Sequence, residues 1–284
     1  MLSLALAALA FIGIHIGISG TAARDALVRR ITLNGYMLLF TAASIAAMVW
    51  LVIAYQKADY IPTWGMLGAW KPVMIALMLP AFLLVVVGLA TPSPTAVNGE
   101  RLVEAEPRGI LRITRHPFLM GVALWSALHL VGNGDWASFL FFGALFVVAA
   151  AGPASIDAKR RRALGPAAWD RFASRTSILP FAAILSGRNH LPGRELGLWR
   201  PAAGLLAYAL MLGGHVHLIG VSPWPGSERP LTPPPQRPPP SDARPFDRHM
   251  QQGRNPDRAP HRRRQRQPVR QVPPQHQQLH HRIP

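Results

Sequence analysis

Six stretches of the chain consist almost entirely of apolar residues. No Asp, Glu, Lys or Arg interrupts them, and none shows the polar face that a soluble core helix repeats every 3.6 residues. About 20 apolar residues in a helix cross the hydrocarbon layer of a bilayer. The pattern therefore predicts an all-α fold, a polytopic transmembrane bundle of about six spans. The spans are Leu2–Ser19, Leu33–Tyr55, Pro72–Ala90, Pro117–Val131, Trp136–Gly152 and Pro201–Val221.

Three shorter segments add detail to this pattern. Gly132-Asn133-Gly134-Asp135 is a turn-forming string, so the fourth and fifth spans should form a tight helical hairpin. Ile178–Leu185 is apolar but too short to cross a bilayer, which predicts an interfacial segment. The N-terminal Met1-Leu2-Ser3 lacks the basic region of a signal peptide, so we interpret the first apolar run as a retained helix.

Basic residues concentrate in the loops that follow the first, third and fifth spans, whereas the loops after the second and fourth spans are nearly neutral. Cytoplasmic loops of membrane proteins carry the excess of Lys and Arg. The three basic loops are therefore predicted to be cytoplasmic and the N-terminus to lie outside. We expect an integral protein of a bacterial inner (plasma) membrane, in contact with membrane lipid.

The C-terminal segment 226–284 differs in composition from everything before it. Of the formal net charge of +17, residues 227–284 contribute +8, from twelve arginines and four acidic residues. A segment dominated by Pro, Arg and Gln has little to bury in a core. We expect residues 1–225 to form the membrane domain and the tail to be disordered. No nucleic-acid partner is expected, and a basic patch for nucleic acid or anionic lipid is the alternative.

Histidines supply the ionisable groups within the predicted spans, and such groups at membrane depth are usually functional. At about 1.5 Å of rise per residue, His15 and His116 share a level near the cytoplasmic face. His129 shares a deeper level with His215 or His217. Either pair could hold a haem iron, because neutral imidazole is a common axial ligand and the chain has no cysteine. The structural alternative is an interhelical hydrogen bond.

The tripeptide Arg115-His116-Pro117 opens the fourth span. Proline at the first helical position costs no hydrogen bond and starts the helix. Arg115, just outside the bilayer, could bind a carboxylate or propionate through paired donors. Its alternative role is that of an interface anchor.

Several strings together, spread over roughly residues 1–225, resemble the NnrU family. That family is associated with denitrification and is similar to cis-zeta-carotene isomerase. The strings are Phe11–His15, Arg115–Gly121, Leu124–Leu130, Asn133–Asp135 and His215–Pro223.

The resemblance implies a multi-span membrane protein, and its isomerase branch implies a haem b cofactor that acts on a polyene double bond. His15 and His116 match the family's histidines in the first span and the Arg-His-Pro string, which makes them the expected metal ligands. His129, His215 and Arg115 are further candidates for binding the cofactor. The implied functions are isomerisation of a lipophilic polyene or an accessory role in nitrogen-oxide metabolism, with other membrane proteins as partners.

A second resemblance connects Arg115–Gly121 and Gly165–Phe172 to membrane methyltransferases that modify isoprenylcysteine or phospholipids. In those enzymes a pair of glutamates helps to hold S-adenosylmethionine. Here the pair reads Ile156-Asp157, so one carboxylate is missing. A methyltransferase and a non-enzymatic assembly partner of a membrane complex are thus the alternatives. Arg115, His116 and Asp157 would then be relics of a shared scaffold or a polar cytoplasmic site.

Overall fold

The computed structural model describes residues 1–19, 21–96 and 99–226, and helices are the regular structure throughout these ranges. The principal helices are α1 (Leu2–Ile12), α2 (Ala22–Gln56), α3 (Lys71–Leu89), α5 (Pro117–Asn133), α6 (Trp136–Leu164) and α9 (Trp199–Ile219). The short helices are η1 (Gly13–Ile18), η2 (Gly68–Trp70), η3 (Glu100–Leu102), α4 (Ile110–Ile113), α7 (Pro166–Ser174), α8 (Ala182–Leu185) and η4 (Gly193–Leu196).

The all-α prediction is confirmed for the described residues. Four helical segments are long and apolar enough to cross a membrane: Ala22–Gln56, Gly68–Leu89, Trp136–Leu164 and Trp199–Ile219. Two shorter apolar helices, Leu2–Ile18 and Pro117–Asn133, complete the six elements expected from the hydrophobic pattern. The predicted disorder of the tail concerns residues 227–284, which lie outside the described residues.

The long helix α2 contains a break at Thr32. This residue has φ 66° and ψ 167°, which is not helical, so the chain kinks there. The predicted span begins at the next residue, Leu33. The preceding turns hold Arg24, Asp25 and Arg29 and are therefore polar. The kink separates a charged helical segment from the apolar one.

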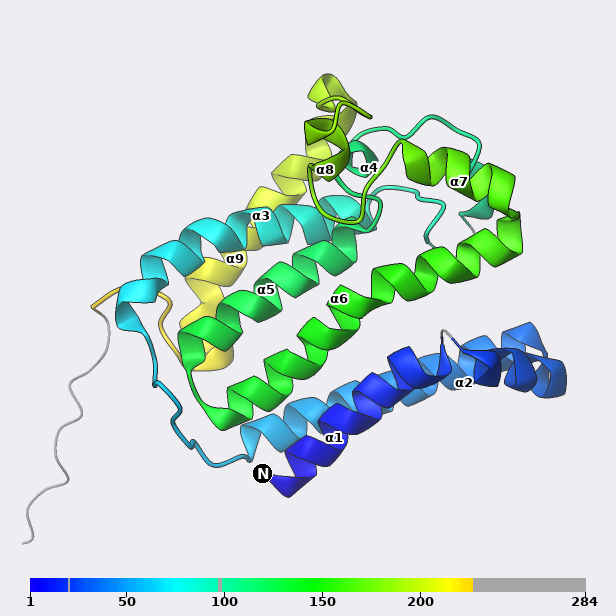
Figure 1. Cartoon of the computed structure of the whole chain (residues 1–284). Coiled ribbons are helices and arrows are strands. Elements are labelled where there is room, and N and C mark those ends of the chain that lie inside the picture. Colours follow the sequence, from blue (N-terminus) through cyan, green and yellow to red (C-terminus); the bar gives the residue numbers. More distant parts are fainter. Residues whose placement is uncertain (20, 97–98, 227–284) are drawn as a thin grey trace, which may run out of the picture. The chain divides into compact units, whose positions relative to one another are not determined.

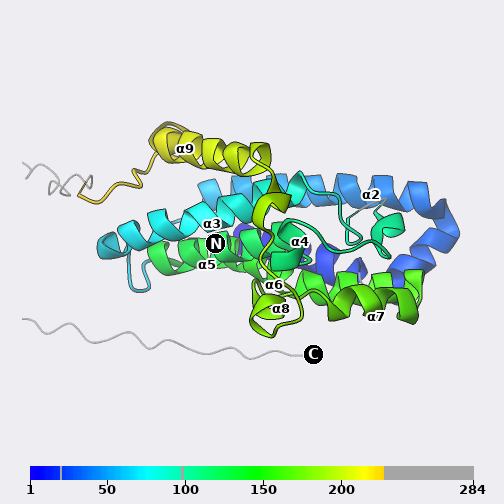
Figure 2. The same ribbon diagram turned by 90° about the horizontal axis from the view of Figure 1, so that it is seen from above.

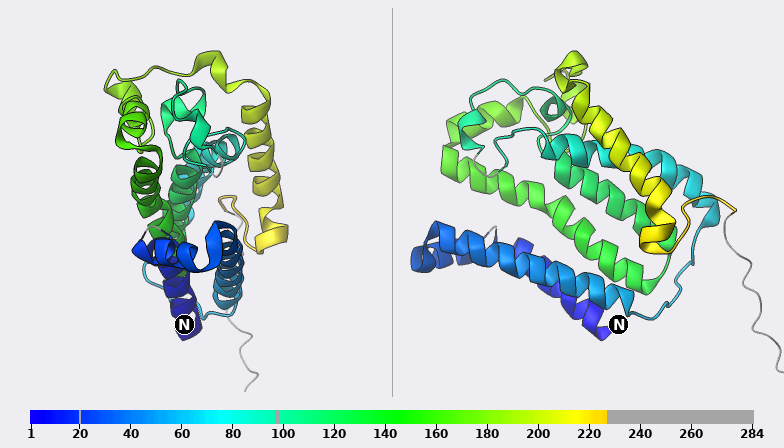
Figure 3. Two further views of the ribbon diagram at one scale, coloured as in Figure 1. Left: turned by 90° about the vertical axis from the view of Figure 1, so that its right-hand side faces the viewer. Right: turned by 180° about the vertical axis from the view of Figure 1, so that it is seen from behind.

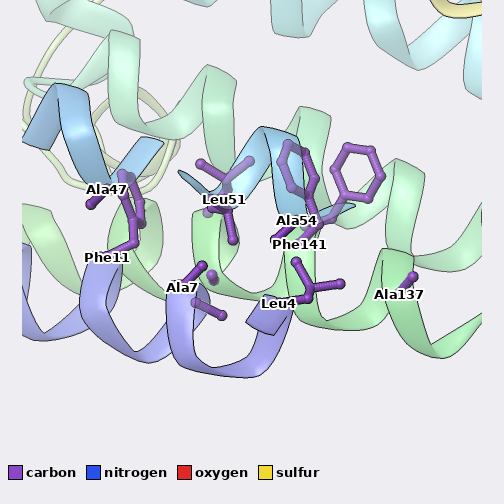
Figure 4. Close-up of a cluster of buried hydrophobic side chains, with 12 residues drawn as sticks. Leu4, Ala7, Phe11, Ala47, Leu51, Ala54, Ala137 and Phe141 are labelled. Atoms are coloured by element: carbon purple, nitrogen blue, oxygen red, sulfur yellow. The ribbon is translucent and has the colours of Figure 1, made fainter. Parts of the chain in front are cut away.

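The long helices lie side by side in a fixed order. Helix α3 packs between α9 and α5, and α5 packs between α3 and α6. The antiparallel pair of α1 and α2 lies against α6 (Figures 1 and 2). A hydrophobic cluster of Ala, Leu and Phe side chains joins these last three helices, including Leu4, Phe11, Leu51 and Phe141 (Figure 4).

Close packing of α3 against α5 depends on a glycine. A Cβ atom at Gly121 would lie 2.8 Å from the carbonyl oxygen of Ala81 and 2.9 Å from the backbone nitrogen of Val85. Real side chains do not tolerate such distances to backbone atoms. Small residues at helix crossings are the usual means by which membrane helices approach each other.

The predicted hairpin between α5 and α6 is confirmed. Gly134 ends α5 in the left-handed conformation, with φ 58°, and Asp135 caps α6 by accepting a hydrogen bond from the Ser138 amide at 2.9 Å. The loop before α3 fastens the turn, because the amides of Thr63 and Gly65 both donate to the Gly134 carbonyl at 2.9 Å.

Candidate functional site

A buried cluster of three ionisable side chains joins the start of α5 to α6. Pro117 begins α5, and the two residues before it, Arg115 and His116, turn toward Asp157 on the neighbouring helix. The Arg115 Nε and Nη2 atoms donate to Asp157 Oδ2 at 2.9 and 2.5 Å. His116 Nε2 lies 2.7 Å from Asp157 Oδ1. Both oxygens of Asp157 are therefore engaged by the Arg-His-Pro string.

A second charged pair lies at the same end of the bundle. Arg112 donates through Nε and Nη2 to the two carboxylate oxygens of Glu195, at 2.7 and 3.0 Å, and Gly109 adds a backbone donor at 2.9 Å. These donors stabilise the ionised carboxylate, and the Arg112 hydrogen bonds lower the pKa of Glu195 to about 2. We call Arg112, Arg115, His116, Asp157 and Glu195 the ion-pair layer.

His15 lies in a turn of π-helix that extends α1, over Gly13–Ile18. Its Nδ1 atom lies 2.8 Å from the carbonyl oxygen of Phe11, and its ring packs on the Phe11 ring at 4.3 Å and edge-on to Phe40 of α2 at 5.6 Å. Single π-helical turns within helices are rare and occur frequently at functional sites.

His129 lies twelve residues into α5. Its Nδ1 atom is 2.9 Å from the Trp125 carbonyl oxygen, and its ring stacks on Phe142 of α6 with ring centres 4.5 Å apart. His215, on α9, is near enough to interact with it electrostatically. The His215 Nδ1 atom is 2.7 Å from the carbonyl oxygen of Val221.

His15, His129 and His215 therefore share one arrangement. In each, Nδ1 faces a backbone carbonyl, so that nitrogen carries the proton and donates it. In the neutral ring, the lone pair is then on the Nε2 atom. Metal-binding histidines are usually oriented in this way, because a hydrogen bond from the other ring nitrogen fixes the tautomer. Each of these three imidazoles therefore has the orientation that an iron ligand requires.

The structure places the predicted site residues in two groups. Arg115 and His116 meet at Asp157, and His129 lies within electrostatic range of His215. His15 and His116, the expected metal pair, have different neighbours: His15 contacts Phe11 and Phe40, whereas Nε2 of His116 faces Asp157. The shared level of His15 and His116 stays a prediction.

Sequence reasoning missed two features of this region, the π-helical turn at His15 and the pair formed by Arg112 and Glu195. It grouped Asp157 with Arg115 and His116, as relics of a shared scaffold or as a polar cytoplasmic site. A signal for the pair of Arg112 and Glu195 existed, since Arg112 is a charged residue in the otherwise uncharged string before Arg115. Its partner is 83 residues away in sequence, beyond any local pattern.

Two curated relatives are similar to part of the chain. The 15-cis-zeta-carotene isomerase of the maize chloroplast, from Zea mays, is 34% identical over 84 residues, which is 30% of this chain and 23% of the relative. The Arabidopsis thaliana chloroplast enzyme of the same name is 33% identical over 84 residues, with the same coverage of 30% and 23%. The matched stretch thus spans under a quarter of these relatives.

Other comparisons define the family. No solved structure matches the chain significantly. The model of the NnrU protein family matches residues 3–223, which cover the four long and the two shorter apolar helices except Leu2, and all the candidate site residues. The chain belongs to the NnrU family.

Proposed function

We propose that the protein is a haem-dependent isomerase that acts on a lipophilic polyene within the membrane. The observation that carries the proposal is the orientation of His129, whose Nε2 lone pair is available at membrane depth on a helix packed among apolar neighbours. The partial likeness to 15-cis-zeta-carotene isomerases supports the substrate class. A polyene would reach such a site from the bilayer, in which it dissolves.

The residues that would hold the haem are His129 and His215, with His15 as a third candidate. When bound, the haem would supply an iron centre able to act on a double bond of the polyene. The chain itself fixes the imidazole tautomers through backbone carbonyls and excludes water with apolar side chains such as Phe142 and Trp125. His116 fits less well, because its Nε2 is already bound to Asp157.

The contacts of Asp157 bear on the methyltransferase alternative. A carboxylate that helps to hold S-adenosylmethionine must have acceptor capacity for it. Both Asp157 oxygens already accept from Arg115 and His116, and the neighbouring position is Ile156. This favours a structural link between α5 and α6 over a cofactor site. A nitrogen-oxide accessory role, implied by the resemblance to NnrU proteins, would use the same haem without isomerase activity.

An absorption spectrum of the full chain tests the proposal. Protein produced with ample haem and purified in mild detergent should show a Soret band, with sharper α and β bands after reduction. Alanine variants of His15, His116, His129 and His215 would then identify the ligands, and conversion of a cis polyene, followed by chromatography, would test the activity. Protein that binds no tetrapyrrole would refute the proposal. Bound haem without isomerisation would favour the accessory role.

A further inference from the structure

A cavity of about 320 Å³ opens at the end of the bundle where α3 ends and α9 begins. Its walls come from Thr91 and Pro92 after α3, from the loop before α4, from Phe172 of α7, and from the segment that leads into α9. Figures 1 and 3 show α4, α8 and the first turn of α9 gathered at this end. By the positive-inside rule this is the cytoplasmic boundary of the bilayer. Glu195 of the ion-pair layer lines this cavity, but none of the candidate haem ligands does.

The two arginines in the cavity lining are not neutralised by its two glutamates. The lining contains two arginines, Arg108 and Arg200, and two glutamates, Glu106 and Glu195. Each glutamate is paired with an arginine that does not line the cavity: Glu195 with Arg112 and Glu106 with Arg175. The two lining arginines are therefore left without a carboxylate partner in the described part of the chain.

Both arginines have guanidinium nitrogens that can donate to an anion. Arg108 is exposed and precedes Gly109 at the start of α4. Arg200 donates from Nε to the Ala90 carbonyl at 3.2 Å, and its guanidinium lies 5.1 Å from the centre of the Trp199 ring. The backbone contact holds Arg200 in place while its terminal amines stay available for an anion. Guanidinium groups bind phosphate through paired donors.

The remaining surface suits an amphiphile better than a soluble anion. Ile110, Leu111 and Leu196 form apolar parts of the wall. Just outside, Leu89 at the end of α3 is 70% exposed and Leu198 before α9 is 90% exposed. Large apolar side chains this exposed, beside the ends of membrane helices, are expected to contact acyl chains.

We propose that this cavity binds the phosphate headgroup of an anionic phospholipid, with Arg108 and Arg200 as its ligands and with acyl chains along Leu89 and Leu198. The site is independent of haem and of the proposed isomerase activity. It would anchor the cytoplasmic end of α9 to the lipid surface.

Native mass spectrometry of the full chain in detergent, titrated with phosphatidylglycerol, tests this site. The variant Arg108→Gln/Arg200→Gln should bind the lipid more weakly, by roughly fivefold for each arginine removed. The matched control is Arg101→Gln/Arg194→Gln, which removes the same charge from exposed positions outside the cavity and should bind like the wild type. If the double cavity variant does not fold, Arg108→Gln alone, at an exposed position, carries the test.

Two further probes define the ligand. Phosphatidylcholine should bind much more weakly than phosphatidylglycerol, and inorganic phosphate or glycerol phosphate should not displace the bound lipid at equal concentration. Equal binding of both lipids, or equal losses in the cavity and control variants, would overturn the proposal. Displacement by the soluble phosphates would overturn the lipid assignment in favour of a soluble anion.

Discussion

The histidines of the apolar spans and the residues of the ion-pair layer differ in where their hydrogen-bond partners lie. His15 and His129 each bind a carbonyl of their own helix, four residues back. Arg115 and Arg112 instead bind carboxylates 42 and 83 residues away in the sequence. The first arrangement leaves one ring nitrogen for a ligand, and the second consumes every oxygen of its carboxylates in holding segments together.

Because of this difference, we expect the two regions to contribute differently to ligand binding and to the stability of the fold. A side chain whose hydrogen bond is to its own helix can be removed without breaking a polar link between two helices, and only its ring contacts are lost. A buried carboxylate that joins two helices cannot be removed without a loss of stability, because buried cations are then left without a partner. Substitutions in the spans should therefore affect binding more than folding, and substitutions in the ion-pair layer should do the reverse.

The largest expected effect on folding is that of Asp157→Asn. The change leaves the nearly buried Arg115 and the buried His116 facing a neutral side chain, and breaking a buried pair typically costs about 3–5 kcal/mol. Thermal unfolding in detergent, followed by loss of helical circular dichroism, should show a markedly lower midpoint.

Asp170→Asn is the matched control. Asp170 also accepts two hydrogen bonds from one arginine, Arg161, at 2.8 Å each, but both side chains are about half exposed. Exposed pairs contribute little to stability. We expect no measurable change in the midpoint, and equal losses for the two variants would show that burial of the cluster is unimportant.

The next effect is on cofactor binding. His129→Ala removes a proposed ligand, a hydrogen bond local to α5 and the ring contact with Phe142 of α6, so the unfolding midpoint should fall, but by less than in Asp157→Asn. The affinity for haem should fall by at least the roughly 10–100-fold that loss of an outer-shell partner costs a metal site. His190→Ala, at an exposed position before η4, is the control. Retention of the Soret band in His129→Ala would remove this residue from the site.

A third change tests the packing of the interior. Gly121→Ala places a methyl group against backbone atoms of α3, which cannot move away without shifting the helix. Overpacking of this kind costs about 1–3 kcal/mol. Gly143→Ala on α6 is the control, because nothing lies within 4 Å of its added Cβ. A midpoint for Gly121→Ala as high as that of the control would mean that α3 and α5 are less tightly packed.

The sequence was sufficient to predict the six apolar helices, because each has a local physical cause, but not α7 or the extension of α6 to Leu164. Apolar runs specify the spans, Gly134 and Asp135 specify the hairpin, and Pro117 specifies the start of α5. Even the kink at Thr32 coincides with the boundary between charged and apolar residues. Such signals lie within a few positions of one another and need no knowledge of the tertiary structure.

The partners of the polar side chains could not be predicted in the same way. His116 was expected to bind iron with His15, and its grouping with Asp157 was only the alternative, which came from a resemblance and not from the string Arg115-His116-Pro117. The contact of His116 with Asp157 depends on how α6 is rotated against α5, which is decided by many side chains together. The orientation of the His129 ring could not be predicted either, although its hydrogen-bond partner, the carbonyl of Trp125, is one helical turn away.

The smallest expected effect concerns pH and Glu195. Its folded-state pKa is lowered to about 2, so the ion pair with Arg112 contributes stability above the ordinary carboxyl pKa, and that contribution is lost as pH falls from about 4.5 toward 2. At neutral pH, Glu195→Gln should lower the unfolding midpoint by about 2–4 °C. The difference from wild type should shrink as the buffer is acidified through this range. Glu104→Gln, at an exposed position in the same loop region, should match the wild type at every pH. A Glu195→Gln deficit that stays constant down to pH 3 would mean that the carboxylate charge is not what holds η4 to α4.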